Sequence, residues 1–447
     1  MNWSRAIALI VLCASAAAAQ VSPERDSAAI SGKVVAARSA PLPGAQVFAI
    51  HRETNFGGIA ETGEDGEFVI ADLPLGDYTL RVERFGFTPL FLDVGLEVEG
   101  RELELTLERG ADFTPSGGKP TPENYATVTV FYGTDREALG PGRYGPRRGT
   151  LAFGETEVSI PRNHRMGRLE SPSIWKLEFR PDPEKHVAVI SVSAQSRAEF
   201  LGGVNAVIEG SESRSALVFV HGFNVTFTDA SRRTAQIAYD LGFDGAPIMY
   251  SWPSNGRTID YVADGDNNAW SVPNAREFLR LIAAESGARN VHVVAHSMGN
   301  RLLTSALAEL ASGVDEDTLA RINQVALVAP DIDADVFRRD IAPRILPVGS
   351  RVTLYASSRD KALLAAKALR RGYPRAGDLS DGIMVVRGLD TVDVSALDTS
   401  FVGHSYYADN ESVVSDLFYL MRGIAAANRF RLQPETADGL PYWRFVP

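Results

Sequence analysis

The sequence predicts an α/β domain with a mostly parallel sheet, preceded by a small all-β sandwich. Residues 28–109 alternate apolar and polar side chains in short segments, which is typical of half-buried strands. From residue 126 onward, continuous apolar runs alternate with helical patterns, as in a parallel sheet covered on both faces. A stretch rich in proline and glycine, residues 110–125, separates the two patterns and is predicted to be a linker.

The composition excludes several classes of protein. The chain has 447 residues, of which 45% are hydrophobic and 23% charged, as in ordinary globular proteins. Its net charge of −11, without a long basic run, argues against binding nucleic acid by electrostatics. The one cysteine, Cys13, lies in a predicted leader, and the remaining chain therefore has no disulfide, cysteine-ligated zinc or cysteine nucleophile.

Residues 1–19 are predicted to be a signal peptide. Arg5 precedes a short apolar core, and small residues ending at Ala19 form a cleavage site. The apolar run is short for a membrane span, and no later stretch is apolar enough to cross a bilayer. We therefore expect an exported protein, periplasmic or secreted, without a transmembrane segment once the leader is removed.

Residues 28–109 are predicted to form the sandwich. Its clearest apolar faces are Tyr78, Leu80, Val82, Leu103, Leu105 and Leu107. The segments ISGKVV, PLPGAQVFA and TGEDGEFVIADLPLGDYTLRVERFGF resemble the carboxypeptidase regulatory-like, transthyretin-like domain. The resemblance implies an accessory domain without catalytic residues, and it makes the sandwich a candidate for contact with the envelope or with carbohydrate.

Residues 126–430 are predicted to be the catalytic domain, with 126–215 as an extension of its sheet, and residues 431–447 are a tail without a readable pattern. The predicted buried strands are 216–220, 247–250, 291–295, 324–329 and 351–356. The predicted helices between them are 229–241, 272–286, 298–310 and 335–341.

The strongest motif is a serine between a predicted strand and a predicted helix. His296-Ser297-Met298-Gly299 follows the apolar run 291–295. Such a turn places the hydroxyl at the carboxyl edge of the sheet, with the following N–H groups pointing at it. The tight turn needs small residues on both sides of the serine; Gly299 is one, and Ala295 stands where glycine is more usual.

A second motif follows the predicted strand 216–220, which ends in His221-Gly222-Phe223-Asn224. In acyl-transfer enzymes of this architecture, the loop after that strand supplies one N–H to the oxyanion, and the residue after the nucleophile supplies the other. The expected donors here are the backbone N–H groups of Phe223 and Met298.

The base and the acid are expected later in the chain. Among seven histidines, His404 is the candidate base, because it follows the last predicted strand and matches the chain order serine, acid, histidine. Asp360 and Asp331 each follow a predicted strand, and either could orient the imidazole. The acid usually follows the penultimate strand, which favours Asp360, whereas Asp331 also suits the capping of a helix.

Six segments in this order resemble a bacterial α/β-hydrolase family of unknown function. They are LVFVHGFNVTFTD, PIMYSWPSNG, VHVVAHSMGNRLL, ALVAPDIDADVF, VTLYASSRDKAL and GHSYY, and the resemblance covers about residues 126–430. It implies an α/β-hydrolase fold and a serine hydrolase with Ser297, Asp360 and His404 as its triad. It does not imply a substrate.

The sequence thus predicts an exported serine hydrolase that acts on a small-molecule or lipid-like ester, with no cofactor and no metal. Hydrolysis of an amide or a thioester stays open, as does a non-catalytic envelope protein that binds with the same fold. The sequence does not predict the oligomeric state. Hydrolysis of short p-nitrophenyl esters distinguishes the two classes, because an esterase turns them over and a binding protein does not.

Overall fold

The computed structural model describes residues 27–36, 40–54, 56–84, 87–108, 118–119, 125–172, 180–369, 372–397, 411–429 and 431–446. The predicted leader and most of the predicted linker lie outside these residues. Of the predicted linker, Gly118–Lys119 is described; it forms the short strand β9, which pairs with β10 (Tyr125–Gly140).

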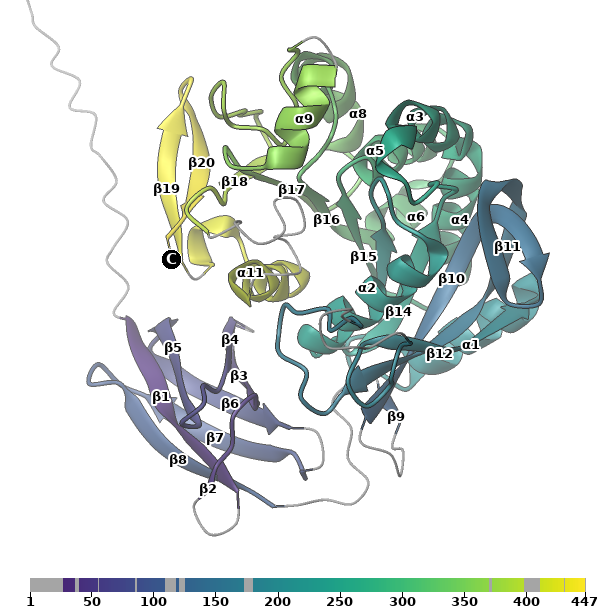
Figure 1. Ribbon diagram of the computed structural model, residues 1–447. Coiled ribbons are helices and arrows are strands. Elements are labelled where there is room, and N and C mark those ends of the chain that lie inside the picture. The colour runs from purple at the N-terminus through teal and green to yellow at the C-terminus, as the bar shows by residue number, and fades with distance from the viewer. Residues whose placement is uncertain are drawn as a thin grey trace, which may run out of the picture.

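The N-terminal segment forms two facing sheets (Figure 1). The first has the order β2 (Ala40–Pro41), β1 (Ser27–Ala36), β5 (Glu67–Pro74), with β8 (Arg101–Leu107) also paired to β1. The second has the order β4 (Gly57–Glu61), β3 (Gln46–His51), β6 (Gly76–Glu83), β7 (Leu90–Leu96). The predicted apolar faces of β6 and β8 point into the core, where Tyr78, Leu80 and Val82 are fully buried.

Among the described residues, a twelve-stranded mixed sheet organises the rest of the chain. Its order is β12-β11-β10-β14-β13-β15-β16-β17-β18-β20-β19, with β9 also on β10. The strands not yet given are β11 (Arg143–Pro161), β12 (Ala188–Gln195), β13 (Ser215–Val220), β14 (Gly245–Ser251), β15 (Asn290–His296), β16 (Ile322–Val328), β17 (Arg351–Ala356), β18 (Asp390–Asp393), β19 (Leu432–Ala437) and β20 (Leu440–Phe445).

The middle of this sheet is parallel, as the apolar runs predict. All pairs from β10 through β14, β13, β15, β16, β17 and β18 to β20 are parallel, whereas β9, β11, β12 and β19 are antiparallel to their neighbours. The carboxyl ends of the parallel strands therefore meet at one edge, where parallel sheets place their ligands.

Helices cover both faces of the sheet (Figure 1). They are α1 (Arg197–Glu209), α2 (Phe227–Asp240), η3 (Thr258–Asp260), α3 (Tyr261–Trp270), α4 (Val272–Glu285), α5 (Gly299–Leu310), α6 (Glu316–Arg321), α7 (Ala334–Val336), the π-helical η4 (Phe337–Ile341), α8 (Ala342–Ile345), α9 (Lys361–Leu369), α11 (Glu411–Met421) and η5 (Ala426–Asn428). Leu217 and Phe219 of β13 pack with α2 and α11, whereas Val218 packs on the other face with α1, α4 and α5.

The C-terminal tail corrects one expectation. Residues 431–447, in which the sequence shows no pattern, contain the hairpin β19–β20, and β20 pairs with β18. The sheet therefore continues past residue 430. The hairpin lies at the sheet edge with most of its side chains at least partly exposed, and for this reason it lacks the apolar run that marks a buried strand.

One apolar core joins the sandwich to the sheet domain. The ring of Phe48 in β3 lies 5.6 Å from that of Phe418 in α11, and both residues belong to a cluster that continues into the sheet. Outside this core, Arg165 Nη1 pairs with Glu61 Oε1 at 3.0 Å. The two parts therefore share a packed interface rather than a tether alone.

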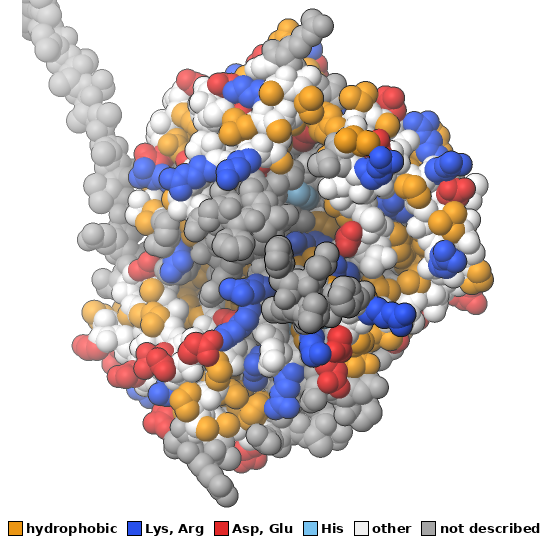
Figure 2. Space-filling model, in the orientation of Figure 1, with side chains coloured by type: hydrophobic (Ala, Val, Ile, Leu, Met, Phe, Trp, Pro, Cys, Tyr) orange, Lys and Arg blue, Asp and Glu red, His pale blue; other side chains and the backbone are white. Residues whose placement is uncertain are grey.

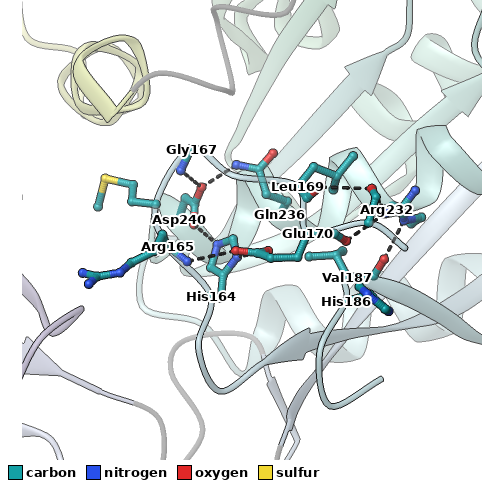
Figure 3. Close-up of polar contacts among 12 residues, drawn as sticks. His164, Arg165, Gly167, Leu169, Glu170, His186, Val187, Arg232, Gln236 and Asp240 are labelled. Carbon is teal, nitrogen blue, oxygen red and sulfur yellow. Dashed lines mark hydrogen bonds and ion pairs between the residues drawn. The ribbon is translucent and has the colours of Figure 1, made fainter. Parts of the chain in front are cut away.

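Buried charges fix residues 162–171 to α2 (Figure 3). His164 Nδ1 lies 2.8 Å from Glu170 Oε2, and its Nε2 lies 2.7 Å from Asp240 Oδ1. Burial alone would lower the pKa of His164, but the Asp240 and Glu170 carboxylates outweigh it and raise the pKa to about 10. His164 is therefore a cation held between two anions at neutral pH.

The surface of the sandwich is acidic. Figure 2 shows red Asp and Glu side chains gathered over the sandwich at the lower left, and its exposed carboxylates include Asp93, Glu102 and Glu104. Such a surface does not attract a polyanion by long-range electrostatics.

Candidate active site

Ser297 occupies a tight turn between β15 and α5. Its φ angle is +52°, in the left-handed region that a residue with a side chain rarely adopts. The turn is held by the Ser297 N–H, which donates to the carbonyl oxygen of Val328 at 3.0 Å, and by Asn300, whose amide donates to the carbonyl oxygens of Ser297 and Val328. Strained backbone of this kind concentrates at functional sites.

The loop after β13, His221-Gly222-Phe223-Asn224 (here the HG loop), lies against this turn. β13 and β15 are parallel neighbours with Val220 opposite Ala295, and both loops therefore leave the same edge of the sheet. A Cβ on Gly222 would lie 2.9 Å from Ser297 Cβ, and a Cβ on Gly299 would lie 2.3 Å from the His221 carbonyl oxygen. Only glycine lets the two backbones approach this closely.

The two predicted oxyanion donors belong to these facing loops. Phe223 is the residue after Gly222, and its ring contacts that of Tyr261, with 5.3 Å between centroids. Met298 is fully buried and directly precedes α5, where helix N–H groups are available to an anion. The structure thus brings the loops of Phe223 and Met298 together at the serine.

His221 holds the HG loop in place. Its Nε2 lies 3.2 Å from Ser251 Oγ and 3.3 Å from Arg136 Nη2, and its Nδ1 lies 2.9 Å from the Gly222 carbonyl oxygen. Donors at Nε2 assign the proton to Nδ1. Burial and the Arg136 guanidinium lower the pKa of His221 to about 3. His221 is therefore neutral, and its ring stacks on Trp252.

The two candidate acids have different surroundings. Asp331 follows β16, and its carboxylate accepts from the Tyr261 hydroxyl at 2.7 Å, from Arg301 at 2.7 Å and from Arg375 at 2.8 Å. Asp331 is thus the centre of an ion-pair network. Asp360 follows β17, is fully buried, and caps α9 through N–H groups of that helix at 2.9 and 3.0 Å.

The sequence comparisons give the family. Residues 196–422, half of the chain, match the family described as "alpha/beta hydrolase of unknown function". The chain belongs to this hydrolase family. Residues 29–108 match the carboxypeptidase regulatory-like domain, and both resemblances seen in the sequence are thereby confirmed.

Other similarities are short or weak. Over 71 residues the chain is 33% identical to an uncharacterized protein of Nostoc sp., and the match covers 16% of this chain and 18% of that protein. Among solved structures, the 3-chlorocatechol 1,2-dioxygenase of Rhodococcus opacus is 14% identical over 19% of this chain and 61% of its own, with a TM-score of 0.17. The group B streptococcus pilus 2b backbone protein is 20% identical over 19% of this chain and 41% of its own, with a TM-score of 0.16.

The predicted base, His404, lies outside the described residues. The neighbouring chain is informative: β18 pairs in parallel with β17, and it therefore ends at the sheet edge that carries Ser297 and Asp360. The described chain then reaches Leu397 and resumes at α11.

Sequence reasoning missed the residues that support the site. Arg136 is fully buried on β10. Burial lowers its pKa to about 10, although the nearby carboxylates of Asp135, Asp264 and Asp229 act to raise it. Its side chain donates hydrogen bonds to Ser251, Ser254, Val225 and Gly145, and it also contacts His221. No motif marks it, because its partners lie up to 118 residues away. Arg301 and Arg375 escaped notice for the same reason.

The described part of the chain has neither a metal-binding cluster nor a helix that could span a membrane. Nowhere in it do three or more His, Cys, Asp and Glu side chains form a group able to hold a metal ion. Nor does any of its helices combine the length and the apolar character that a membrane crossing needs.

Proposed function

We propose that this chain is an exported serine hydrolase of the α/β-hydrolase fold, and that it cleaves carboxylic esters. Ser297 is the nucleophile, His404 the general base, Asp360 the residue that orients His404, and the N–H groups of Phe223 and Met298 the oxyanion donors. Residues 1–19 serve as the export signal, 28–109 as an accessory domain, 110–125 as a linker, and the sheet domain from 126 as the catalytic unit.

The main support for this proposal is the backbone at Ser297. Its turn is strained, and it lies directly against Gly222 of the HG loop. A φ of +52° has an energetic cost of about 1–3 kcal/mol. A nucleophile needs this conformation to project its hydroxyl beyond the sheet. The contact of Gly222 with Ser297 supplies the second loop that an oxyanion site requires.

The reaction follows from these positions. His404 takes the proton of Ser297 as Oγ attacks the acyl carbon, and the oxyanion accepts from Phe223 and Met298. Each such donor typically stabilises the transition state by about 3–4 kcal/mol. The intermediate collapses, the alcohol leaves with the proton from His404, and the acyl group stays on Oγ. Water, deprotonated by His404, then releases the acid and restores the serine.

Asp360 suits the orienting role better than Asp331. The Asp331 carboxylate is bound by two guanidinium groups and a tyrosine hydroxyl, and turning it toward an imidazole would break a buried ion pair. Asp360 follows the next strand, β17, and its Oδ1 accepts from two N–H groups at the start of α9.

The test is turnover of p-nitrophenyl butyrate by purified protein and by Ser297→Ala. We expect hydrolysis by the wild type and a loss of at least a thousandfold in the variant, with an unchanged unfolding temperature. Parallel assays with a p-nitroanilide and a thioester determine whether the enzyme prefers an ester, an amide or a thioester bond. Folded wild type that turns over none of the three would overturn the proposal in favour of a binding protein.

A further inference from the structure

A cavity of about 350 Å³ near the start of α5 has no role in the acyl transfer described above. Its lining consists of Arg301, Ile332, Asp333, Tyr373 and Arg375. The volume lies at the lower end of the range typical of small-molecule sites. Two arginines from different elements face it, one from α5 and the other from the loop after α9.

Hydrogen bonds through Asp331 link one wall of the cavity to the backbone of the proposed nucleophile. Arg301 lies about one helical turn after Ser297. The N–H of Asp331 donates to the Ser297 carbonyl oxygen at 3.3 Å, and Arg301 Nε donates to the Asp331 carbonyl oxygen. Arg301 also donates to the hydroxyl of Tyr261, whose ring contacts Phe223. Arg301 is therefore linked to both the serine turn and the HG loop, whereas Arg375 donates to Asp331.

Asp331 binds both arginines of the cavity wall. Arg301 Nη2 and Arg375 Nε share the Asp331 carboxylate, at 2.7 and 2.8 Å, and this trio keeps one positive charge. The remaining carboxylate of the lining, Asp333, accepts two N–H groups at the start of α7, and it brings the formal charge of the four side chains to zero. The cavity therefore offers an anion the N–H donors of its arginines rather than a net positive charge.

Both guanidinium groups keep donors for a ligand. Arg301 binds its partners through Nε and Nη2, as does Arg375, and within the described residues the Nη1 group of each has no hydrogen-bond partner. Arg375 is only 5% exposed, and a low-dielectric setting strengthens its bond to an anion. Paired guanidinium donors match the two oxygens of a carboxylate or a phosphate.

We propose that this cavity binds an anionic group, a carboxylate or a phosphate, carried on the acyl part of the substrate. Ile332 and the ring of Tyr373, which is 61% exposed, lie beside the arginines and contact the methylene chain between the anion and the ester. The inference rests on the proposed function, because it names the substrate class for Ser297.

The kinetic test compares two esters of equal acyl length, mono-p-nitrophenyl glutarate and p-nitrophenyl valerate. We expect wild type to prefer the charged ester at least tenfold in kcat/KM at low salt, and the preference to shrink in 0.5 M NaCl because screening weakens the contact. Equal kcat/KM values, or a preference for valerate, would overturn the inference.

Variants locate the preference. Arg375→Gln should raise KM for the glutarate ester by tenfold or more and leave the valerate ester within threefold. Arg375→Lys keeps the positive charge but loses the paired donors of the guanidinium group. Its KM for the glutarate ester should therefore lie between those of wild type and Arg375→Gln. The matched control is Arg339→Gln on η4, whose side chain is 76% exposed and which should change neither ester. If Arg375→Gln folds poorly, the double variant Asp331→Asn/Arg375→Gln takes its place in the assay. The double variant also removes the Asp331 carboxylate, which would otherwise lose one of its two arginine partners.

Binding without turnover separates this inference from the proposed function. In Ser297→Ala, glutarate and inorganic phosphate are titrated by calorimetry, with glutaramide as the neutral control. We expect saturable binding of at least one anion, none of glutaramide, and loss of binding with Arg375→Gln. Such binding in a protein that hydrolyses no ester would refute the esterase and keep the site. Hydrolysis without any anion binding would refute the site and keep the esterase.

Discussion

Ser297 is the residue at which sequence and structure agree most closely. The motif around it predicts a sharp turn, and the structure has a positive φ angle there. Gly222 and Gly299 make the turn sterically possible, because a Cβ at either position would collide with the facing loop. Ala295, where glycine is more usual, lies inside β15 and is fully buried, and the strand therefore accommodates its methyl group.

The acid is the residue-scale question that the sequence left open, and two substitutions answer it. Asp360→Asn should lower kcat by about 10³- to 10⁴-fold, as expected when the orienting carboxylate is lost, with a modest loss of unfolding free energy. Asp331→Asn should leave kcat largely intact and should lower the free energy of unfolding by about 3–5 kcal/mol, because it weakens a buried network with two arginines. Steady-state kinetics and urea unfolding of both variants are the measurements.

The opposite assignment has a clear signature. If Asp331→Asn abolishes turnover while Asp360→Asn remains active, Asp331 is the acid, and its contacts with Arg301 and Arg375 must rearrange during catalysis.

At the scale of elements, the buried strands were predictable and the C-terminal hairpin was not. The apolar runs predict β13 to β17 within one or two residues at each end, because strands buried on both faces have no polar alternation. Residues 126–215 are predicted to extend the sheet, and β10, β11 and β12 lie in it. The hairpin β19–β20 borders solvent, and its mixed pattern resembles that of a loop.

The segment 162–171 gives a prediction of pH dependence. The fold raises the pKa of His164 from an ordinary 6.5 to about 10. Its contribution to stability is therefore complete below pH 6.5 and is lost as pH rises toward 10. Contact with His164 lowers the pKa of Glu170, although burial opposes this, and the Glu170 contribution fades as pH falls below about 4.5. The combined contribution is greatest in the window between those values.

His164→Gln tests this prediction. The free energy of unfolding at pH 6 should fall by about 3–5 kcal/mol, because two buried carboxylates lose their cation. The decline in stability of wild type between pH 7 and 10 should flatten in the variant. A double-mutant cycle with Glu170→Gln should show coupling. Parallel pH profiles for wild type and His164→Gln would show that the ring is not charged in the folded state.

At the scale of the whole molecule, the sequence predicted the two parts but not their contact. A linker rich in proline and glycine suggests independent domains, yet Phe48 and Phe418 belong to one core cluster. Nothing in either segment marks these rings as partners, because their spacing fits an ordinary internal core in each part. Likewise, Arg136 and His221 meet only because β10, β14 and β13 are neighbours in the sheet.

The shared core predicts that the two parts unfold together. Phe418→Ala, at a position 3% exposed, should lower the free energy of unfolding by about 3–5 kcal/mol. Phe91→Ala, on the sandwich surface at 62% exposure, is the matched control and should stay within about 0.5 kcal/mol. Tryptophan fluorescence and far-ultraviolet circular dichroism should follow one transition in urea. Two separate transitions in wild type would contradict this prediction.

The central claim is that the Ser297 hydroxyl attacks the substrate. The most direct measurement is labelling of the folded protein with a fluorophosphonate, followed by digestion and mass spectrometry of the modified peptide. We predict one adduct, on Ser297, that disappears in Ser297→Ala while the circular dichroism spectrum is unchanged. An unlabelled wild type, or an adduct that persists in the variant, would contradict the account.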